Sequence, residues 1–386
     1  MKLADRVANI SESVTLGLTA KAKKLAKEGI DLVSFTAGEP DFDTPKNIKN
    51  AAIESIEGGF TKYTPSSGIP ELREAICGKL LKDNQLQYKP EQIIVSCGAK
   101  HSLYNLIQAL CDKGDEVIIP SPYWVSYPEM VSLAEGESVF VKTKEENDFK
   151  ATLNDLKKAT TKKTKLFILN SPSNPTGCVY ALDELRAIAA WAVDNNVFVI
   201  SDEIYEKLIY DSEKHISIAS LNEDIKTLTA VVNGLSKTYS MTGWRIGYLA
   251  ACSEVAQAVN AMQSHSTSNP TSISQKAALE AILGDQSFIE VMKKEYLARR
   301  DYMAERLNKI KGFSCRKPRG AFYIFCNISG LGIKSDDLAN RLIDEARVVV
   351  VPGAGFGDDH FIRLSFATSI ANIKKGIDRL EQWAKR

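Results

Sequence analysis

Short hydrophobic runs alternate with longer amphipathic stretches along the middle of the chain, from about residue 92 to residue 263. Runs without polar interruption, such as Phe198-Val199-Ile200, are typical of strands that are covered on both faces. The stretch 182–193 instead repeats its apolar side chains at helical spacing. Regular alternation of strands and helices predicts mostly parallel pairing, so we expect a doubly wound α/β sheet. Its predicted strands, about seven in number, lie at 93–96, 117–119, 139–141, 165–170, 197–201, 228–233 and 246–250.

The C-terminal part has a different pattern, in which strands and helices do not alternate regularly. Together with one helix near the N-terminus, these segments are typical of an α+β domain. We therefore predict a large domain formed by residues 46–285, inserted between the two halves, 1–45 and 286–386, of a smaller α+β domain. The elements expected in the smaller domain are helices over 16–27, 286–309 and 335–346, strands over 321–328 and 361–366, and a closing helix.

The composition is that of a globular protein and argues against several functional classes. The 49 basic residues nearly balance the 48 acidic ones, so the chain offers no electrostatic attraction for nucleic acid or for an anionic membrane. No apolar run approaches the roughly 18 residues of a membrane span, and the start has no signal-like run, so we expect a cytoplasmic protein. The seven cysteines are scattered without metal-ligand spacing, and the four histidines are not paired. These patterns predict neither a disulfide framework nor a metal site.

Polar residues concentrate directly after the predicted strands, where ligands bind in open α/β sheets. Gly98 and Ala99 follow the first strand and open a helix, whose free N–H groups favour phosphate. Asn174 lies in a loop that two prolines and a glycine stiffen, which would hold its amide in place. Asp202 and Tyr205 follow the fifth strand, and a carboxylate at such a buried position needs a cationic partner.

A lysine and an arginine lie in a loop rich in glycine and serine after the sixth strand. In a desolvated site with cationic neighbours, the amine of Lys237 could stay neutral enough to attack a carbonyl. Arg245 follows in the same loop and could bind a phosphate through its planar guanidinium. A lone lysine and arginine would normally lie on the surface, but their setting in this loop is unusual.

In combination these residues resemble the class I pyridoxal-phosphate-dependent aminotransferases. Residues 234–247 match the lysine-attachment motif of that family position by position, apart from a phosphate-binding serine that some relatives have at Gly234. The loop 174–177, the Asp202–Tyr205 pair and the late Arg363 follow in the family's order. The stretch 122–128 is most similar to the bacterial aspartate aminotransferase branch. The resemblance implies fold type I, with pyridoxal 5'-phosphate as the cofactor.

The resemblance also implies a role for each matching residue around the cofactor. Lys237 attaches the cofactor and afterwards acts as the base that moves a proton. Asp202 pairs with the ring nitrogen and keeps it protonated, and Tyr205 and Asn174 hydrogen-bond the phenolate oxygen. The remaining contacts implied are ring stacking by Trp124 and phosphate binding by Gly98, Ala99, Ser236, Arg245 and Tyr63 of the neighbouring subunit.

The substrate's α-carboxylate is implied to be gripped by Arg363, whose planar guanidinium can bind it through two parallel hydrogen bonds. Gly38, Asn174 and Trp124 are implied to assist in binding the substrate.

The distal carboxylate of a dicarboxylic substrate is implied to be bound by Lys100, with Ser264 contributed by the other chain. The arginine that another branch uses for this purpose is missing, because Ser264 stands at its position. Since Tyr63 and Ser264 both serve the neighbouring subunit, the resemblance implies a homodimer with shared active sites.

The function predicted from the resemblance is transfer of an amino group from L-aspartate to 2-oxoglutarate through a ping-pong cycle, with amino acids and 2-oxo acids as substrates. An aminotransferase that prefers aromatic amino acids or prephenate is a near alternative, and a β-lyase with the same cofactor machinery is another. A lyase need not have a cation such as Lys100, so the carboxylate pocket discriminates between these enzymes. A non-catalytic binding protein is disfavoured because every cofactor position is present.

Overall fold

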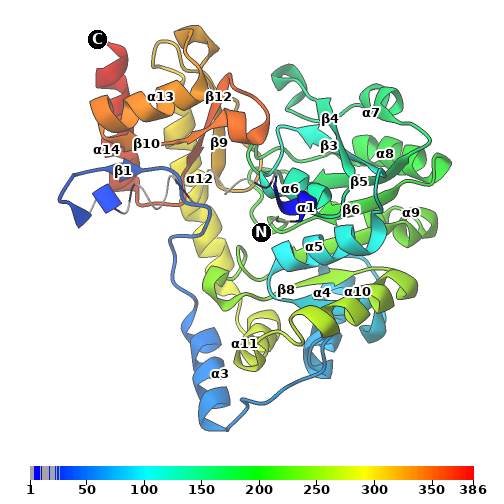
Figure 1. The fold of residues 1–386 in the computed structure, drawn as a ribbon. Helices are drawn as coiled ribbons and strands as arrows, with labels where there is room; N and C mark the ends of the chain where they lie inside the picture. The colour runs from blue at the N-terminus through cyan, green and yellow to red at the C-terminus, as the bar shows by residue number, and fades with distance from the viewer. Residues whose placement is uncertain (1–3, 9, 11–16, 18–21, 23, 26) are drawn as a thin grey trace.

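The computed structural model describes residues 4–8, 10, 17, 22, 24–25 and 27–386, and its central feature is a sheet of seven strands (Figure 1). From one edge to the other, the sheet consists of β2 (Ile93–Ser96), β8 (Gly247–Ala250), β7 (Thr229–Gly234), β6 (Phe198–Asp202), β5 (Thr164–Asn170), β3 (Glu116–Ser121) and β4 (Glu137–Lys142). Strand β8 runs antiparallel to both of its neighbours, and every other pair is parallel. The predicted mostly parallel sheet of seven strands is therefore confirmed.

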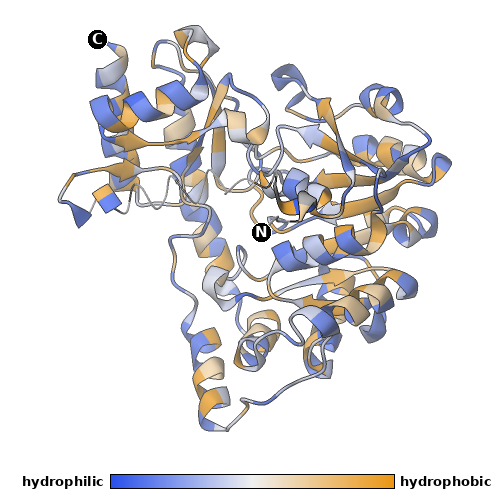
Figure 2. Ribbon diagram, in the orientation of Figure 1, coloured by the Kyte–Doolittle hydropathy of each residue, from blue (hydrophilic) through white to orange (hydrophobic). Residues whose placement is uncertain are grey.

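Helices cover both faces of this sheet. Along β5, Leu166 and Ile168 pack into one hydrophobic cluster while Phe167 and Leu169 pack into another, because successive side chains of a strand point to opposite faces. Burial on both sides explains why the strands lack polar interruptions, and Figure 2 shows hydrophobic colour concentrated in them. The surrounding helices are α3 (Lys46–Glu57), α4 (Pro70–Asn84), α5 (Ala99–Leu110), α6 (Ser126–Leu133), α7 (Leu153–Ala159), α8 (Leu182–Asp194), α9 (Glu223–Thr227), α10 (Ser253–Ser266) and α11 (Ser272–Leu283).

The C-terminal part forms a second group of elements around its own hydrophobic cluster. An antiparallel sheet has the order β11 (Val351–Pro352), β12 (Phe361–Ser365) and β9 (Tyr323–Asn327), and it packs with α12 (Ser287–Leu307), α13 (Ser335–Arg341) and α14 (Ile370–Ala384). Strand β1 (Val33–Ser34) pairs with β10 (Val348–Val349) and so joins the N-terminal part to this group. That pairing supports the division into domains at residues 45/46 and 285/286, which stays our proposal.

Several element boundaries differ from the predicted ones. The strand expected over 321–328 begins only at Tyr323, because Ala321 has a φ of 57°, which a strand does not allow. The helix expected over 335–346 changes after Arg341 into a short π-helical turn, Leu342–Ala346. The helix expected over 16–27 falls mostly outside the described residues.

None of the described helices is both long and apolar enough to cross a bilayer. Several short helical segments lie between the longer elements. The short segments are α1 (Asp5–Ala8) and the 3-10 turns Pro90–Gln92, Glu145–Asn147, Ile218–Ser220, Thr242–Trp244, Ser329–Leu331 and Gly353–Phe356.

Candidate active site

A cavity of about 660 Å³ lies where the loops after β2, β5, β6 and β7 meet the start of β9 and the middle of β12. This is the carboxyl-end edge of the parallel strands, where polar residues were predicted to converge. Four cationic side chains but only two carboxylates line it among the described residues, so the cavity favours anionic ligands. The predicted site residues in its wall are Gly38, Ala99, Lys100, Trp124, Asn174, Asp202, Tyr205, Ser236, Lys237, Arg245 and Arg363.

Lys237 lies in the turn after β7, and its amine faces the cavity. Its Nζ donates a 2.5 Å hydrogen bond to the carbonyl oxygen of Gly38, which brings the N-terminal segment to the site. Burial lowers the pKa of Lys237 to about 8; the Glu39 carboxylate opposes this shift, and nearby guanidinium groups reinforce it. An amine with this pKa has an appreciable neutral fraction near neutral pH, which a nucleophile requires.

Asp202 ends strand β6 with its carboxylate buried. Burial raises its pKa to about 6, although a 2.7 Å hydrogen bond from the Tyr127 hydroxyl and one from the backbone N–H of Ile204 oppose the shift. No lysine or arginine of the described chain lies within ion-pair distance of this carboxylate. A cationic group bound in the cavity would therefore stabilise its charge.

Arg245 and the start of helix α5 form a cradle for an anion. Gly98 precedes the helix with a φ of 90°, and a Cβ built there would lie 2.4 Å from Nη2 of Arg245. Only glycine therefore lets the guanidinium approach the helix N-terminus so closely. The guanidinium is held by hydrogen bonds to the carbonyl oxygens of Thr242 (2.9 Å) and Cys97 (3.2 Å), and buried Ser236 lies in the wall of the same cavity. Helix N–H groups and a guanidinium together favour a phosphate.

Arg363 is a buried cation on β12, with 2% of its surface exposed. Its Nη1 donates to the side-chain oxygen of Asn174 (3.0 Å) and its Nη2 to the carbonyl oxygen of Thr36 (3.1 Å), while its Nε has no hydrogen-bond partner in the described chain. Burial lowers its pKa, and no carboxylate of the described residues pairs with it. A buried guanidinium without a counter-ion is costly, so a bound carboxylate is the partner that this arrangement lacks.

Aromatic side chains fill the space between these charged groups. The Tyr205 hydroxyl lies 3.0 Å from that of Tyr323, whose ring centre is 4.3 Å from the guanidinium carbon of Arg363. On the other side, the ring of Trp124 packs edge-on against Tyr127. The amine of Lys100 lies 4.8 Å from the Trp124 ring centre, and burial, with a smaller effect from Arg245, lowers its pKa.

Gly98, which has no side chain, borders the cavity next to Ala99, whereas the side chains of two other predicted site residues do not reach the cavity of their own chain. The Tyr63 side chain is 90% exposed, and Ser264 is exposed near the end of α10, where its hydroxyl donates to the carbonyl oxygen of Ala261. Their assignment to a neighbouring subunit stays a prediction, since it requires a second copy of the chain.

Comparison with known proteins agrees with this geometry. Residues 30–380 match the family described as aminotransferase class I and II. The chain belongs to this family. An aspartate aminotransferase from Bacillus sp. (strain YM-2) is 50% identical over 388 residues, 99% of each chain, and a probable aspartate/prephenate aminotransferase from Aquifex aeolicus is 47% identical over 385 residues, 98% of each. The structure of an aspartate aminotransferase from Thermus thermophilus with maleate is similar with a TM-score of 0.96 at 43% identity, covering 99% of each chain.

Class I aminotransferases use pyridoxal 5'-phosphate, and the cavity of this family member fits that cofactor. The cradle at Gly98 and Arg245 suits its phosphate, and the cation-free carboxylate of Asp202 suits a protonated ring nitrogen. The Lys237 amine faces the same cavity, where it could attack the aldehyde carbonyl of the cofactor.

The structure also identifies aminotransferase site residues that the sequence did not single out. Tyr127 donates to Asp202, Tyr323 contacts Tyr205, and the Thr36 carbonyl oxygen holds Arg363. Tyr127 lies in the stretch 122–128 that carried part of the resemblance, but no local pattern showed where its hydroxyl points.

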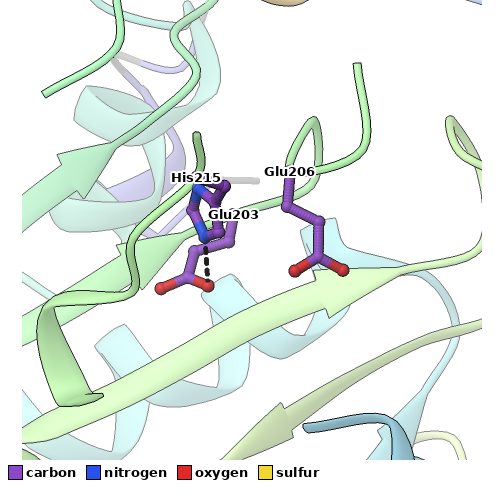
Figure 3. A group of neighbouring side chains, drawn as sticks. All are labelled: Glu203, Glu206 and His215. Carbon is purple, nitrogen blue, oxygen red and sulfur yellow. Dashed lines mark hydrogen bonds and ion pairs between the residues drawn. The ribbon is translucent and has the colours of Figure 1, made fainter. Parts of the chain in front are cut away.

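Glu203, Glu206 and His215 lie close together near Asp202 and have the spacing of a possible metal site (Figure 3). Their carboxylates are already satisfied, since Glu206 forms a buried ion pair with Lys79. A cation placed among them would compete with that ammonium group. The cluster is therefore explained as a buried polar network. Its other contacts are Ser201, Ser217 and His215 on Glu203, and Asn84 on Glu206.

The lowered pKa of Lys237 predicts how its reactivity depends on pH. Burial disfavours the ammonium form, so the proton should leave near pH 8, well below the roughly 10.4 of an exposed lysine. In trace acetylation of the apoprotein at a series of pH values, labelling of Lys237 should rise about tenfold per unit below pH 8 and then level off. Exposed lysines, quantified in the same digest, should continue to gain label up to about pH 10. A Lys237 profile that also rises to pH 10 would contradict the prediction.

Proposed function

We propose that this aminotransferase moves the amino group of L-aspartate to 2-oxoglutarate through a ping-pong cycle. The observation that carries the proposal is that two cations, Arg363 and Lys100, line the cavity without a carboxylate partner among the described residues. Arg363 lies on β12, which is not part of the phosphate cradle, and the Lys100 amine lies over the Trp124 ring, so the two cations suit the two carboxylates of a dicarboxylic substrate. Relatives named aspartate aminotransferase, one of them with bound maleate, support the same substrate class.

The residues of the chain divide the work of this reaction. Bound pyridoxal phosphate supplies an electron sink for the bond that breaks at the substrate Cα. Arg363 grips the α-carboxylate and so fixes the orientation of the Cα–H bond. Lys237 takes the proton from Cα and delivers a proton to the cofactor carbon that is bonded to the transferred nitrogen. A pKa near 8 suits its amine to both transfers. The negative charge of the Asp202 carboxylate would keep the ring nitrogen of the bound cofactor protonated.

We also propose that the enzyme acts as a homodimer in which Tyr63 and Ser264 complete the partner's site. The exposure of both side chains supports this arrangement, because neither has a role within its own chain's cavity. Tyr63 would reach the phosphate, and Ser264 would assist Lys100 at the distal carboxylate.

A second candidate function is transamination of prephenate alongside aspartate. The Aquifex aeolicus relative named for both substrates favours it. Prephenate also carries two carboxylates, so the same pair of cations would suit it.

The test is a panel of half-reactions followed by the visible absorbance of the cofactor-loaded enzyme. Aspartate and glutamate should convert the spectrum rapidly, and oxaloacetate or 2-oxoglutarate should restore it. Rapid conversion by aromatic amino acids alone would overturn the proposal. Release of pyruvate, ammonia and chloride from β-chloroalanine, without spectral conversion by aspartate, would indicate a lyase.

Lys100→Ala should selectively weaken the reaction with dicarboxylic substrates. Because Lys100 is exposed on one side, loss of its contact with the distal carboxylate should lower kcat/KM for aspartate by only about tenfold. The value for alanine, which lacks that carboxylate, should stay unchanged. Lys113→Ala serves as the control, because Lys113 is exposed and lies in the turn just after the same helix, α5. An unaltered preference for aspartate over alanine would contradict the proposal that Lys100 binds the distal carboxylate.

A further inference from the structure

The side-chain amide of Gln263 is a fully buried junction near the end of helix α10, with 0% of the residue exposed. Its Oε1 accepts hydrogen bonds from the Ser96 hydroxyl (2.8 Å) and the Asn105 amide (3.2 Å). Its Nε2 donates to the carbonyl oxygens of Ser66 (2.6 Å) and Val95 (2.8 Å). All four hydrogen-bonding positions of the amide are therefore used, so no other side chain could replace it without leaving buried groups unpaired.

The acceptor side of Gln263 holds the anion cradle of its own chain. Ser96 is the last residue of β2, two positions before Gly98, and Asn105 lies on α5. The turn between these two elements contains Gly98 and leads into the start of α5, which forms the cradle together with Arg245. An amide that binds both of them fixes the direction in which the helix N-terminus points.

One donor bond of Gln263, to the Ser66 carbonyl oxygen, holds the loop 61–68, which carries Tyr63. The loop is also tied by Gln275, whose Nε2 donates to the Thr64 hydroxyl (3.0 Å), and by a 3.0 Å hydrogen bond from the Val95 N–H to the Ser67 carbonyl oxygen. The Tyr63 side chain is nevertheless 90% exposed. A loop held by several hydrogen bonds, with an exposed aromatic side chain, is pre-organised for contact with another molecule.

We propose that Gln263 is a positioning residue for two active sites at once. It sets the cofactor cradle of its own chain through Ser96 and Asn105, and it sets Tyr63, which completes the cradle of the partner, through the loop 61–68. The inference rests on the proposed homodimer. Ser264, the other residue proposed to reach the partner, follows Gln263 directly on α10. Gln263 is therefore linked to both residues, Tyr63 and Ser264, that are proposed to enter the partner's site.

The two effects can be separated in heterodimers that contain one Lys237→Ala chain. Only the chain with Lys237 can attach the cofactor, so the absorbance of lysine-bound pyridoxal phosphate reports on that chain's site alone. Titration of the apo-heterodimer with pyridoxal phosphate then gives a dissociation constant without any turnover. Gln263→Met is placed either in the Lys237 chain or in the Lys237→Ala chain.

We expect Gln263→Met to weaken cofactor binding about tenfold in either position, the size of one lost hydrogen bond to a charged group. Tyr63→Phe in the Lys237→Ala chain sets the loss expected from the partner's loop. Gln257→Met, an exposed glutamine on the same helix, is the matched control and should change nothing. In the apoproteins, hydrogen exchange over 61–68 should accelerate with Gln263→Met and not with Gln257→Met.

A second variant covers the case in which Gln263→Met prevents assembly. Ser96→Ala removes one hydrogen bond to the Gln263 side chain but keeps Gln263 itself. When Ser96→Ala is placed in the Lys237→Ala chain, pyridoxal phosphate should bind about threefold more weakly to the site of the other chain. If Tyr63→Phe weakens binding but neither the Gln263 nor the Ser96 variant does so across the interface, the positioning role is wrong. If Tyr63→Phe also has no effect, the shared site itself fails, and the inference fails with it.

Discussion

Replacing Lys237 with alanine is expected to lower the rate of amino-group transfer by at least about 10⁴-fold, the upper range for loss of a positioned acid–base group. The effect should be this large because the residue has two roles, cofactor attachment and proton movement at the substrate Cα. Lys100 also lines the cavity, but its amine lies over the Trp124 ring and cannot take over both tasks. Single-turnover absorbance changes with aspartate measure the chemical step directly.

The same variant should bind pyridoxal phosphate reversibly, because the anion cradle at Gly98 and Arg245 does not involve the lysine. Its apoprotein should unfold at a temperature no lower than that of the parent, since burial disfavours the charge that is removed. Lys113→Ala controls for the loss of a lysine elsewhere. A Lys237→Ala enzyme that keeps more than a hundredth of the parent rate would exclude the proposed role.

The fold could be predicted in outline because its strands are buried on both faces. That burial leaves an uninterrupted hydrophobic signal, as at residues 198–200, and the seven predicted strands were all found. The sequence alone did not show which strand is antiparallel, because β8 has the same apolar pattern as the strands that pair in parallel elsewhere in the sheet. The late start of β9 depends on the backbone of Ala321, which has no distinctive side chain.

The candidate site could be predicted where a residue's role depends on its place after a strand. Asp202 and Lys237 are of this kind, and both line the cavity. Contacts between distant segments left no local signal: the Tyr127 hydroxyl reaches Asp202 across 75 residues, and the Ser66 carbonyl oxygen reaches Gln263 across 197. Such pairs depend on how the layers pack, and a periodic pattern does not encode that.

Replacing Arg363 with leucine is expected to lower kcat/KM for aspartate by about 10³-fold, as for removal of one partner from a buried ion pair. The structure adds a second expectation of opposite sign. In the apoprotein the guanidinium is buried without a carboxylate partner among the described residues, so its removal relieves a desolvation cost. The free energy of unfolding of the Arg363→Leu apoprotein should therefore be equal to or higher than that of the parent.

The conservative variant Arg363→Lys separates charge from geometry. Lysine keeps the positive charge but cannot form two parallel hydrogen bonds, so we expect about a 10²-fold loss in kcat/KM, between the parent and the leucine variant. The cofactor's dissociation constant should stay within about twofold for both variants, because the phosphate cradle lies on other elements. Arg186→Leu, which removes an exposed arginine paired with Asp183, is the control and should alter neither stability nor activity measurably. Denaturant unfolding and half-reaction kinetics on the same preparations measure both quantities. A leucine variant that is destabilised by several kcal/mol and still uses aspartate normally would show that Arg363 supports the fold instead of the substrate.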